Sequence, residues 1–362
     1  MALKCGIVGL PNVGKSTLFN CLSNAKAQSA NFPFCTIEPN VGVITVPDER
    51  LNKLADIVEP ENLQPTTIDI VDIAGLVKGA SKGEGLGNKF LGNIRETDAI
   101  IHVLRCFDDG NIVHVDGSVD PVRDKETIGY ELILKDLEAV EKKLEKIKRA
   151  AKTGDKSALK SQGILDQYKK HFEDGKSARS IELSDDDKKE VADLFLLTAK
   201  PVLYLCNVDE GSIANGNKHV EAVKAAVKDE DAIVLMVAAG LEADLAELED
   251  PEERKEFLED AGLSEPGVNK LIKAAYALLN LETYFTAGKK EVRAWTIKKG
   301  FTAPQAAGVI HGDFERGFIK VEVIKFNDWV ELGSEQAAKE AGKMNMEGKE
   351  YIVQDGDVMH FK

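Results

Sequence analysis

Long hydrophobic runs are missing from this sequence of 362 residues. No apolar stretch approaches the ~20 residues that a membrane-spanning helix needs, so we expect no membrane segment. The first residues, Met1 to Lys4, lead directly into a predicted strand and leave no room for a signal peptide. These absences favour a cytoplasmic protein.

Cysteine is scarce, and its spacing fits neither a disulfide framework nor a metal site. The pattern predicts free thiols in a reducing compartment. The five residues are scattered and mostly lie in apolar surroundings: Cys5, Cys21, Cys35, Cys106 and Cys206.

Positive charge is also in short supply. The chain has 47 lysines and arginines against 62 aspartates and glutamates, and its formal net charge is -15. A uniformly acidic surface repels phosphate backbones, so contact with a nucleic acid would need a local basic patch. The remaining composition is that of an ordinary globular protein, and the length allows two or three domains.

Short apolar strands alternate with helices over much of the chain, which predicts an α/β fold with a mostly parallel sheet covered on both faces. A helix is expected at Thr17 to Ser23, directly after a Gly-rich loop. The predicted strands are Lys4 to Val8, Thr67 to Ile73, Ala99 to Leu104, Val202 to Cys206 and Ala232 to Val237.

A charged helical segment interrupts this alternation at about residues 125–200. Apolar residues from Ile133 to Ala151 recur at steps of four and three, Thr153-Gly154 breaks the helix, and a second amphipathic stretch runs from Lys156 to about Phe172. The pattern predicts an antiparallel helical hairpin inserted in one nucleotide-binding domain. Such a hairpin is either a packing element or a protruding arm that touches a large partner.

The α/β pattern resumes near Ser184, which is expected to cap a helix that continues through Val191, Leu194 and Phe195. The first domain is predicted to span residues 1–280. A smaller α+β domain should follow at 281–362, with a short helix near Pro304. Its predicted strands are Val292 to Ile297, Phe318 to Ile324 and Tyr351 to Val353.

The segment from Gly9 to Ser16 has the spacing Gly-x-x-x-x-Gly-Lys-Ser of a P-loop, between a predicted strand and a predicted helix. Backbone N–H groups of such a loop surround phosphates, and the helix N-terminus adds its dipole. Lys15 is expected to act on the β- and γ-phosphates as a catalytic residue, and Ser16 to bind Mg²⁺. The predicted nucleotide contacts in the loop are Asn12, Val13, Gly14, Lys15, Ser16 and Thr17.

Later motifs indicate a nucleotide-dependent switch. Asp72 and Gly75 form Asp-x-x-Gly at the end of a predicted strand, where the carboxylate can hold Mg²⁺ and the Gly75 N–H can contact a γ-phosphate. Thr36, in the loop before it, is a candidate for the second hydroxyl ligand to Mg²⁺. The glycine-rich segment that follows is typical of a switch ordered by the γ-phosphate.

Base recognition is predicted after the strand that ends at Cys206. Guanine-specific sites present Asn-Lys-x-Asp, whereas this sequence has Asn207, Val208, Asp209 and Glu210. The lysine and the final aspartate of that motif are both replaced, which removes the reason to prefer GTP and leaves room for ATP.

The residue that positions the attacking water is not evident. Leu76 stands where many GTPases carry a glutamine, so the group comes from elsewhere in the chain, from a partner, or is missing, and slow turnover is expected. His102 lies within a predicted strand and is interpreted as a core residue. His114, in a loop after that strand, is either a catalytic residue that positions or activates water or an ordinary surface histidine.

The sequence resembles the YchF subfamily of Obg-like P-loop proteins over its full length. The resemblance rests on Gly6 to Thr17, on Asp72 to Ala80, on Gly83 to Asn88, and on the departure at Asn207 to Glu210. It implies a switch ATPase that prefers ATP over GTP, an inserted coiled coil, and a hydrophobic residue in place of the catalytic glutamine.

The C-terminal domain resembles a TGS domain, a β-grasp module, at Gly300 to Ala307 and Asp313 to Ile319. This likeness implies association with the ribosome or RNA through the TGS-like domain and the helical insertion. Eight lysines and arginines between residues 288 and 325, against four acidic residues, form a local basic excess, although a solvated face has the same composition.

Two other functions compete with a ribosome-associated ATPase. A GTP-specific translation GTPase shares the P-loop and the switch. A P-loop metabolic kinase would need an acceptor pocket and usually an Arg-rich lid, and the Asp72 switch argues against it.

Overall fold

Strand β1 (Lys4–Val8) lies inside a six-stranded sheet with the order β2-β4-β1-β5-β6-β7. This is seen in a computed structural model that describes residues 3–29, 41–73 and 87–362. β1 pairs in parallel with β4 and β5, and the parallel pairing continues through β6 to β7. The bounds of the other strands are β2 (Val41–Thr45), β4 (Thr67–Asp72), β5 (Ala99–Arg105), β6 (Val202–Asn207) and β7 (Ile233–Val237).

The two strands β5 and β6 are buried along their whole length. Their sequences are mostly apolar, as expected for parallel strands covered on both faces. The prediction of a mostly parallel α/β sheet is therefore confirmed. The helices of this part are α1 (Lys15–Ser29), α3 (Gly87–Arg95), α4 (Pro121–Lys152), α5 (Lys156–Glu173), α6 (Asp185–Lys189), α7 (Lys218–Ala226), α8 (Ala239–Glu247), α9 (Pro251–Asp260) and α10 (Gly267–Leu278).

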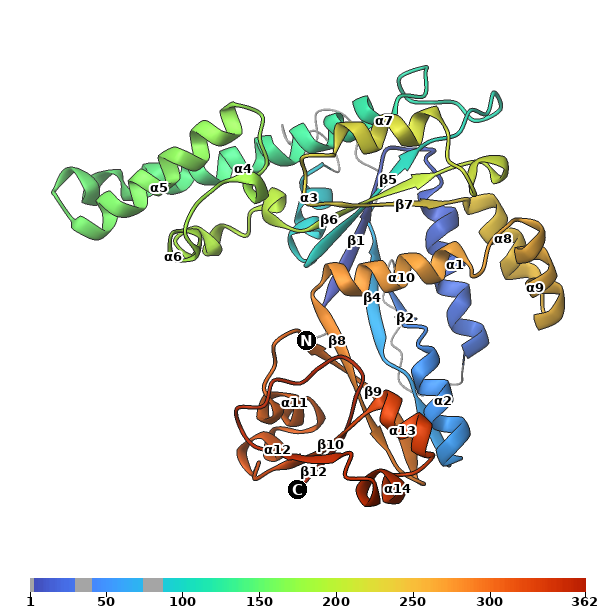
Figure 1. The fold of residues 1–362 in the computed structure, drawn as a ribbon. Coiled ribbons are helices and arrows are strands. Elements are labelled where there is room, and N and C mark those ends of the chain that lie inside the picture. The colour runs from blue at the N-terminus through green and yellow to red at the C-terminus, as the bar shows by residue number, and fades with distance from the viewer. Residues whose placement is uncertain (1–2, 30–40, 74–86) are drawn as a thin grey trace. The chain divides into compact units, whose positions relative to one another are not determined.

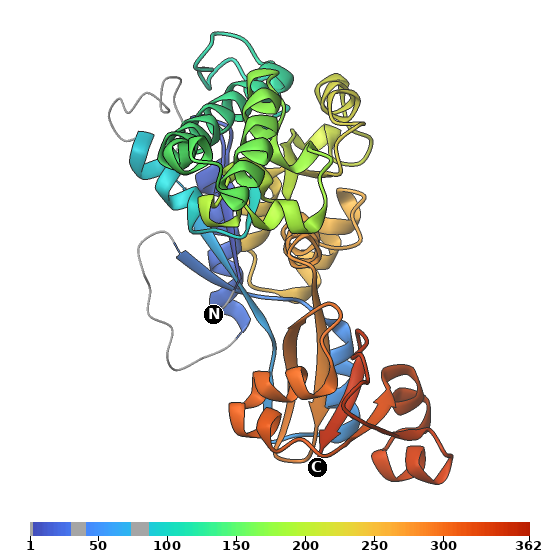
Figure 2. The same cartoon turned by 90° about the vertical axis from the view of Figure 1, so that its left-hand side faces the viewer.

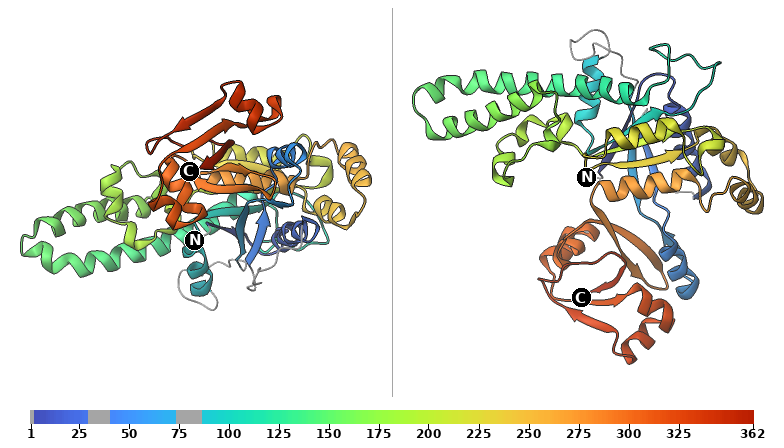
Figure 3. Two further views of the ribbon diagram at one scale, coloured as in Figure 1. Left: turned by 90° about the horizontal axis from the view of Figure 1, so that it is seen from below. Right: turned by 45° about the horizontal axis from the view of Figure 1, so that its top comes forward.

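Helices α4 and α5 form the predicted antiparallel hairpin and extend away from the sheet (Figures 1 and 3). Asp120 and Asp155 cap their N-termini, and both side chains accept backbone N–H groups of the first turn. The apolar stripe of α4 packs against α5 around Val140, Leu165 and Tyr168, which are almost fully buried. The hairpin thus has its own core, separate from the sheet.

A buried carboxylate joins the hairpin to the chain that returns from it. Asp136 of α4 is 1% exposed and accepts the backbone N–H groups of Leu197 and Thr198, at 2.7 and 2.8 Å, and the Thr198 hydroxyl at 2.7 Å. Burial raises the pKa of Asp136, and these hydrogen bonds oppose that rise. One side chain therefore satisfies three buried donors.

The structure divides into two compact units, residues 1–42 with 69–271 and residues 43–68 with 272–362. The second has a sheet ordered β11-β10-β12-β8-β9-β3, and α2 lies against it (Figure 2). The C-terminal α+β module expected from the sequence is present. Its elements are α2 (Glu49–Val58), β3 (Asn62–Gln64), β8 (Leu281–Ala287), β9 (Glu291–Lys298), α11 (Ala303–Ile310), α12 (Gly312–Arg316), β10 (Val321–Lys325), α13 (Phe326–Leu332), α14 (Glu335–Glu340), β11 (Met344–Glu347) and β12 (Asp357–Phe361).

This division differs from the predicted boundary at residue 280. Residues 43–68 group with the C-terminal unit because β3 pairs with β9 and because Leu51 and Leu54 of α2 belong to its core. A short segment with few apolar residues gives no local sign of the sheet that it joins.

Two local predictions were wrong. The helix capped by Ser184 ends at Lys189, and Phe195 has a left-handed backbone and an exposed ring. The segment Tyr351 to Val353 forms a single bridge, from Ile352 to Thr302, where a strand was expected. Among the described helices, none is long and apolar enough to cross a membrane.

We expect Asp136→Ala to loosen the base of the hairpin, because it leaves three buried donors without an acceptor. Amide hydrogen exchange at Leu197 and Thr198 should accelerate by about 10²-fold, since each unsatisfied buried group costs about 1–3 kcal/mol. Glu138→Ala is the control, because this residue of the same helix forms only partly exposed ion pairs with Lys135 and Lys142. Equal exchange in the two variants would contradict the role of Asp136.

Candidate functional site

The P-loop leaves β1 and turns directly into α1. Asn12 and Gly14 have positive φ angles of 64° and 88°. A Cβ at Gly14 would also collide with the side chain of Asn207, so both the backbone angle and the close approach require glycine there. Helix α1 begins at Lys15, so the loop faces a helix N-terminus, as the motif predicted.

Lys15 and Asp72 meet at the adjacent ends of α1 and β4. The ammonium group of Lys15 is hydrogen-bonded to Oδ1 of Asp72, and both side chains are mostly buried. The hydroxyl of Ser16 lines the same cleft and is exposed. Carboxylate and hydroxyl oxygens are hard donors that suit Mg²⁺, so the donor set fits this ion.

Asn207 has a structural position that the base-recognition motif did not predict. Its side chain is 3% exposed, its Nδ2 donates to the carbonyl of Val13 at 2.9 Å, and its Oδ1 accepts the N–H of Ala239 at 3.0 Å. It therefore ties the P-loop to the start of α8. The other two predicted residues of the motif differ in exposure. Val208 is buried, whereas Glu210 is exposed in the short turn after β6.

These residues line one open cleft of about 1420 Å³ at the carboxyl edge of the sheet. Besides the predicted residues, two further segments contribute to it: 107–110 with Ile112 after β5, and 238–240 after β7. Both strands were predicted, and the loop after β5 was expected on the nucleotide side as the carrier of His114, but residues 107–110, Ile112 and 238–240 were not among the predicted site residues. Because carboxyl ends of parallel strands meet at the same edge, the position directly after each strand was the available signal.

A buried arginine fixes the first half of the loop after β5. Arg105 is 1% exposed, and its guanidinium group donates to the carbonyls of Phe107, Asp109 and Ile112 at 2.9–3.3 Å. It also lies over the ring of Phe107. These contacts hold residues 107–112 against the sheet, where they form one wall of the cleft.

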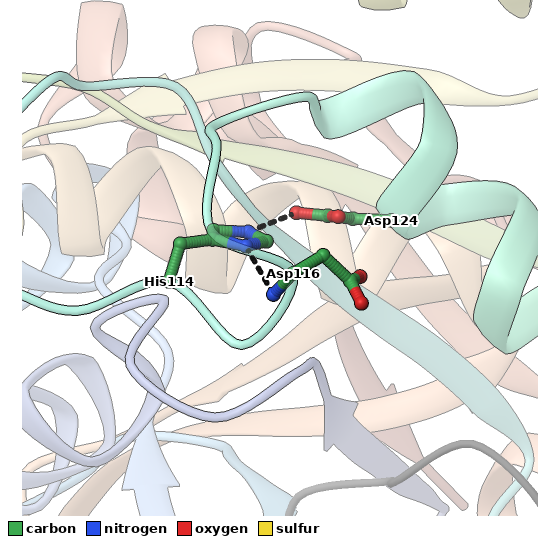
Figure 4. Close-up of side chains that lie close together, drawn as sticks. All are labelled: His114, Asp116 and Asp124. Carbon is green, nitrogen blue, oxygen red and sulfur yellow. Dashed lines mark hydrogen bonds and ion pairs between the residues drawn. The ribbon is translucent and has the colours of Figure 1, made fainter.

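His114, in the second half of that loop, does not line the cleft and is 7% exposed. Its Nε2 lies 2.8 Å from Oδ2 of Asp124, in the first turn of α4, and its Nδ1 accepts the N–H of Asp116 at 3.1 Å (Figure 4). Burial raises the pKa of Asp124, and the contacts with His114 and Arg123 oppose that rise. The predicted catalytic histidine is therefore engaged at both ring nitrogens in this conformation.

The other histidine of β5 matches its interpretation as a core residue. His102 is 5% exposed and packs beside the ring of Tyr204. Burial, with help from the charges of Lys125 and Arg179, lowers the pKa of His102 to about 3, so the ring is neutral near pH 7. Cys5, Cys21, Cys106 and Cys206 are free thiols, as expected, and all four are buried.

Several predicted site residues lie outside the described part of the chain. Thr36 and Gly75 fall in the segments 30–40 and 74–86, as do Cys35 and Leu76. Asn12, Gly14, Lys15, Ser16, Thr17 and Asp72 are brought together around the cleft with Asn207, Val208 and Glu210. Val13 lies beneath the loop, with a buried side chain.

Two protein-family models match separate parts of the chain. A family model described as "50S ribosome-binding GTPase" matches residues 4–151. The model of the YchF GTPase C-terminal domain, described as "Protein of unknown function", matches residues 281–362.

Similar proteins match along the whole chain. Proteins named "Ribosome-binding ATPase YchF" from Bacillus subtilis and Escherichia coli O157:H7 are each 55% identical to it, over 100% of this chain and 99% of the relative. The solved structure of the Schizosaccharomyces pombe YchF GTPase is 39% identical, with a TM-score of 0.90, and the match covers 100% of this chain and 98% of that one.

We expect Asn207→Asp to destabilise the nucleotide-binding unit, because it replaces the N–H donor to Val13 with an oxygen that faces a carbonyl. The free energy of unfolding should fall by about 1–3 kcal/mol, the usual cost of an unsatisfied buried group. Urea unfolding followed by circular dichroism measures this change. Asp209→Asn, at the exposed neighbouring position, is the control and should unfold like the native chain.

Proposed function

The chain belongs to the YchF family, and on this basis we propose that it is a Mg²⁺-dependent P-loop ATPase that acts as a switch and binds the ribosome. The observation that carries the enzymatic part is the meeting of Lys15, Ser16 and Asp72 in one cleft at a helix N-terminus. The names of the relatives support both parts. Since ribosomes work in the cytoplasm, the proposal also assigns the protein to that compartment.

Each residue of the cleft has a distinct role in this proposal. Main-chain N–H groups of residues 12–17 bind the phosphates, and Lys15 neutralises the charge on the β- and γ-phosphates. Ser16, Thr36 and Asp72 would hold Mg²⁺, which supplies charge neutralisation of the phosphate oxygens when bound. Binding of the nucleotide separates Lys15 from Asp72, so each ends beside a new partner of opposite charge. Gly75 contacts the γ-phosphate and reports its presence to the switch segment.

We expect Lys15→Ala to lower ATP turnover by about 10²-fold or more, the usual cost of removing a group that stabilises charge in the transition state. Ser16→Ala should have a comparable effect through the loss of a Mg²⁺ ligand. Phosphate release at saturating ATP and Mg²⁺ measures both, with Lys224→Ala, an exposed residue of α7, as the control. Undiminished hydrolysis in the first two variants would refute the assignment of the cleft.

The proposed preference for ATP over GTP rests on the residues after β6. Val208 is buried, so no long side chain at that position lies along a base as the lysine of GTPases does. Glu210 is one methylene longer than the aspartate that pairs with guanine, and it is exposed at the rim of the cleft. A GTP-specific enzyme is the alternative, which the description of the matched GTPase family favours.

Calorimetric titration should show tighter binding of ATP than of GTP to the native chain. In the double variant Val208→Lys with Glu210→Asp, the preference should move toward GTP by about tenfold or more, which corresponds to about 1.4 kcal/mol. Asp209→Asn serves as a control for changes in rim charge. A tenfold preference of the native chain for GTP would establish the alternative.

His114 is proposed as the group that positions or activates the attacking water, in place of the glutamine that Leu76 replaces. Its support is the place of its loop. The side-chain Nδ2 of Asn12 in the P-loop donates to the carbonyl of Val113 at 3.1 Å, and residues 107–110, in the loop that carries His114, line the cleft. The backbone next to His114 is thus already in contact with the phosphate-binding loop.

The tip of the helical hairpin is proposed as a contact for ribosomal RNA. Residues 142–160 contain eight lysines and arginines and two acidic residues, a net charge of +6 in a chain of -15. Exposed Lys146, Arg149, Lys152 and Lys156 have no ion pair within the described part of the chain. Phosphates are the natural partners of such charges, and binding releases their counterions.

The TGS-like domain is the other proposed ribosomal contact, although part of its basic excess is neutralised within the unit. Lys325 pairs with Asp357 at 2.6 Å, and Arg316 pairs with Asp313. The hairpin tip carries the larger net charge, +6 over residues 142–160, where eight basic residues face two acidic ones, against +4 over residues 288–325, where eight face four.

We expect the triple variant Lys146→Gln, Arg149→Gln and Lys152→Gln to weaken ribosome co-sedimentation, because it removes three charges from the tip. The dependence of binding on salt should become shallower by about 2–3 in the log–log slope if each side chain contacts one phosphate. The matched control removes three exposed lysines elsewhere in the same unit: Lys224, Lys228 and Lys255. Equal loss in both variants would indicate an effect of net charge alone.

A further inference from the structure

The loop between β5 and α4 is held in two halves by different parts of the molecule. Arg105 fixes residues 107–112 to the sheet. Residues 113–120 are tied instead to the first turn of α4, through His114 with Asp124 and through Arg123 with Ser118. The hydrogen bond from Asn12 to Val113 lies at the boundary between the halves. The second half can therefore rearrange while the wall of the cleft stays in place.

Residues 113–115 show the reverse of the usual burial, because the polar side chain is buried and the two apolar side chains are exposed. The imidazole is 7% exposed, whereas Val113 and Val115 on either side are 75% and 53% exposed. Exposed apolar side chains are unfavourable in water, and a polar ring is buried at low cost only where its nitrogens are hydrogen-bonded. The two exposed valines do not stabilise this conformation by burial, so it depends on the two hydrogen bonds of the ring.

Those two hydrogen bonds also define the chemical state of the ring. Nδ1 accepts the N–H of Asp116, so it carries no proton, and the remaining proton is on Nε2, which donates to the carboxylate of Asp124 (Figure 4). Neither nitrogen is left to bind a water. A ring in this state cannot take part in hydrolysis.

We propose that Asp124 is a positioning residue that withholds His114 from the nucleotide cleft, so that release of this hydrogen bond limits turnover. The inference rests on the catalytic role proposed above for His114. Once the loop releases the ring from Asp124 and from the N–H of Asp116, the unprotonated Nδ1 accepts the proton of a water whose oxygen bonds to the γ-phosphorus while the bond to the oxygen of ADP breaks. The rate is proportional to the fraction of molecules in which the ring is free.

The variant Asp124→Asn tests this proposal, because the amide has the shape of the carboxylate but no charge. A charged acceptor makes a hydrogen bond about twice as strong as a neutral one, so kcat for ATP should rise by about 3- to 10-fold. The dissociation constant for ATP should not change, since His114 does not contact bound nucleotide in the withheld state. An unchanged or lower kcat in a folded variant overturns the proposal.

The double variant His114→Ala with Asp124→Asn separates the pair from a general loosening of the loop. Its turnover should equal that of His114→Ala alone, because there is no ring to release. A rise that persists in the double variant overturns the proposal. If His114→Ala itself turns over ATP at the native rate, the catalytic role of His114 fails, whereas a slow His114→Ala with no rise in Asp124→Asn overturns only the role of Asp124.

The native chain gives a second test that needs no folded variant of Asp124. Nitrogen-15 NMR of the six histidines, with His114 assigned by its loss in His114→Ala, should show the Nε2–H tautomer for His114 without nucleotide. Addition of Mg²⁺, ADP and aluminium fluoride, a mimic of the transferring phosphate, should shift that signal. A signal that stays unchanged overturns the proposal.

Discussion

The parallel pairing of β4, β1, β5, β6 and β7 is the constraint on which the rest of the site depends. Each strand ends at the same edge of the sheet, and a site residue or segment stands at or directly after each end: Asp72, the P-loop, residues 107–110 with Ile112, Asn207 to Glu210, and residues 238–240. Residues separated by more than two hundred positions are thereby collected in one cleft. Asn207 makes the arrangement rigid, because it joins the loops after β1 and β7 through two hydrogen bonds.

Charge balance at this edge explains why Lys15 and Asp72 lie together. Two mostly buried, opposite charges stabilise each other, whereas either one alone would carry a desolvation cost. A magnesium–nucleotide complex presents the same two charges in the opposite order, with phosphates for the lysine and a cation for the carboxylate. The ion pair therefore keeps the site organised without nucleotide. When the ligand binds, each side chain exchanges its partner for a ligand group of the same charge, so neither charge is left uncompensated.

Much of the fold and of the candidate site could be predicted because the signals are local. Val8, Ile101 and Leu205 lie in mostly apolar strands, as expected for a covered parallel sheet, and Gly14 of the P-loop has a backbone angle that other residues avoid. The stripe from Ile133 to Ala151 likewise identified the hairpin, because its period is that of a helix.

The rest depends on contacts between distant segments. The pairing of β3 with β9, about 230 residues later, leaves no mark in either strand, so the boundary at 280 missed residues 43–68. The helix expected through Phe195 ended at Lys189, before the chain reaches Leu197 and its contact with Asp136. The position of His114 was predicted only to the level of its loop, because Asp124 belongs to another element and nothing in the spacing shows that the two side chains meet.

Helix α4 connects the loop of His114 with the basic tip of the hairpin, two features that the sequence alone does not relate to each other. Its first turn holds His114 through Asp124, and its far end carries the basic residues of the hairpin tip. A helix of 32 residues is about 48 Å long, at ~1.5 Å per residue, and Asp136 anchors it near its middle. A force on the tip is therefore resisted first at Asp136 and then at the turn that contains Asp124. The same continuous helix that extends away from the sheet thus also forms the wall against which the loop of His114 is packed.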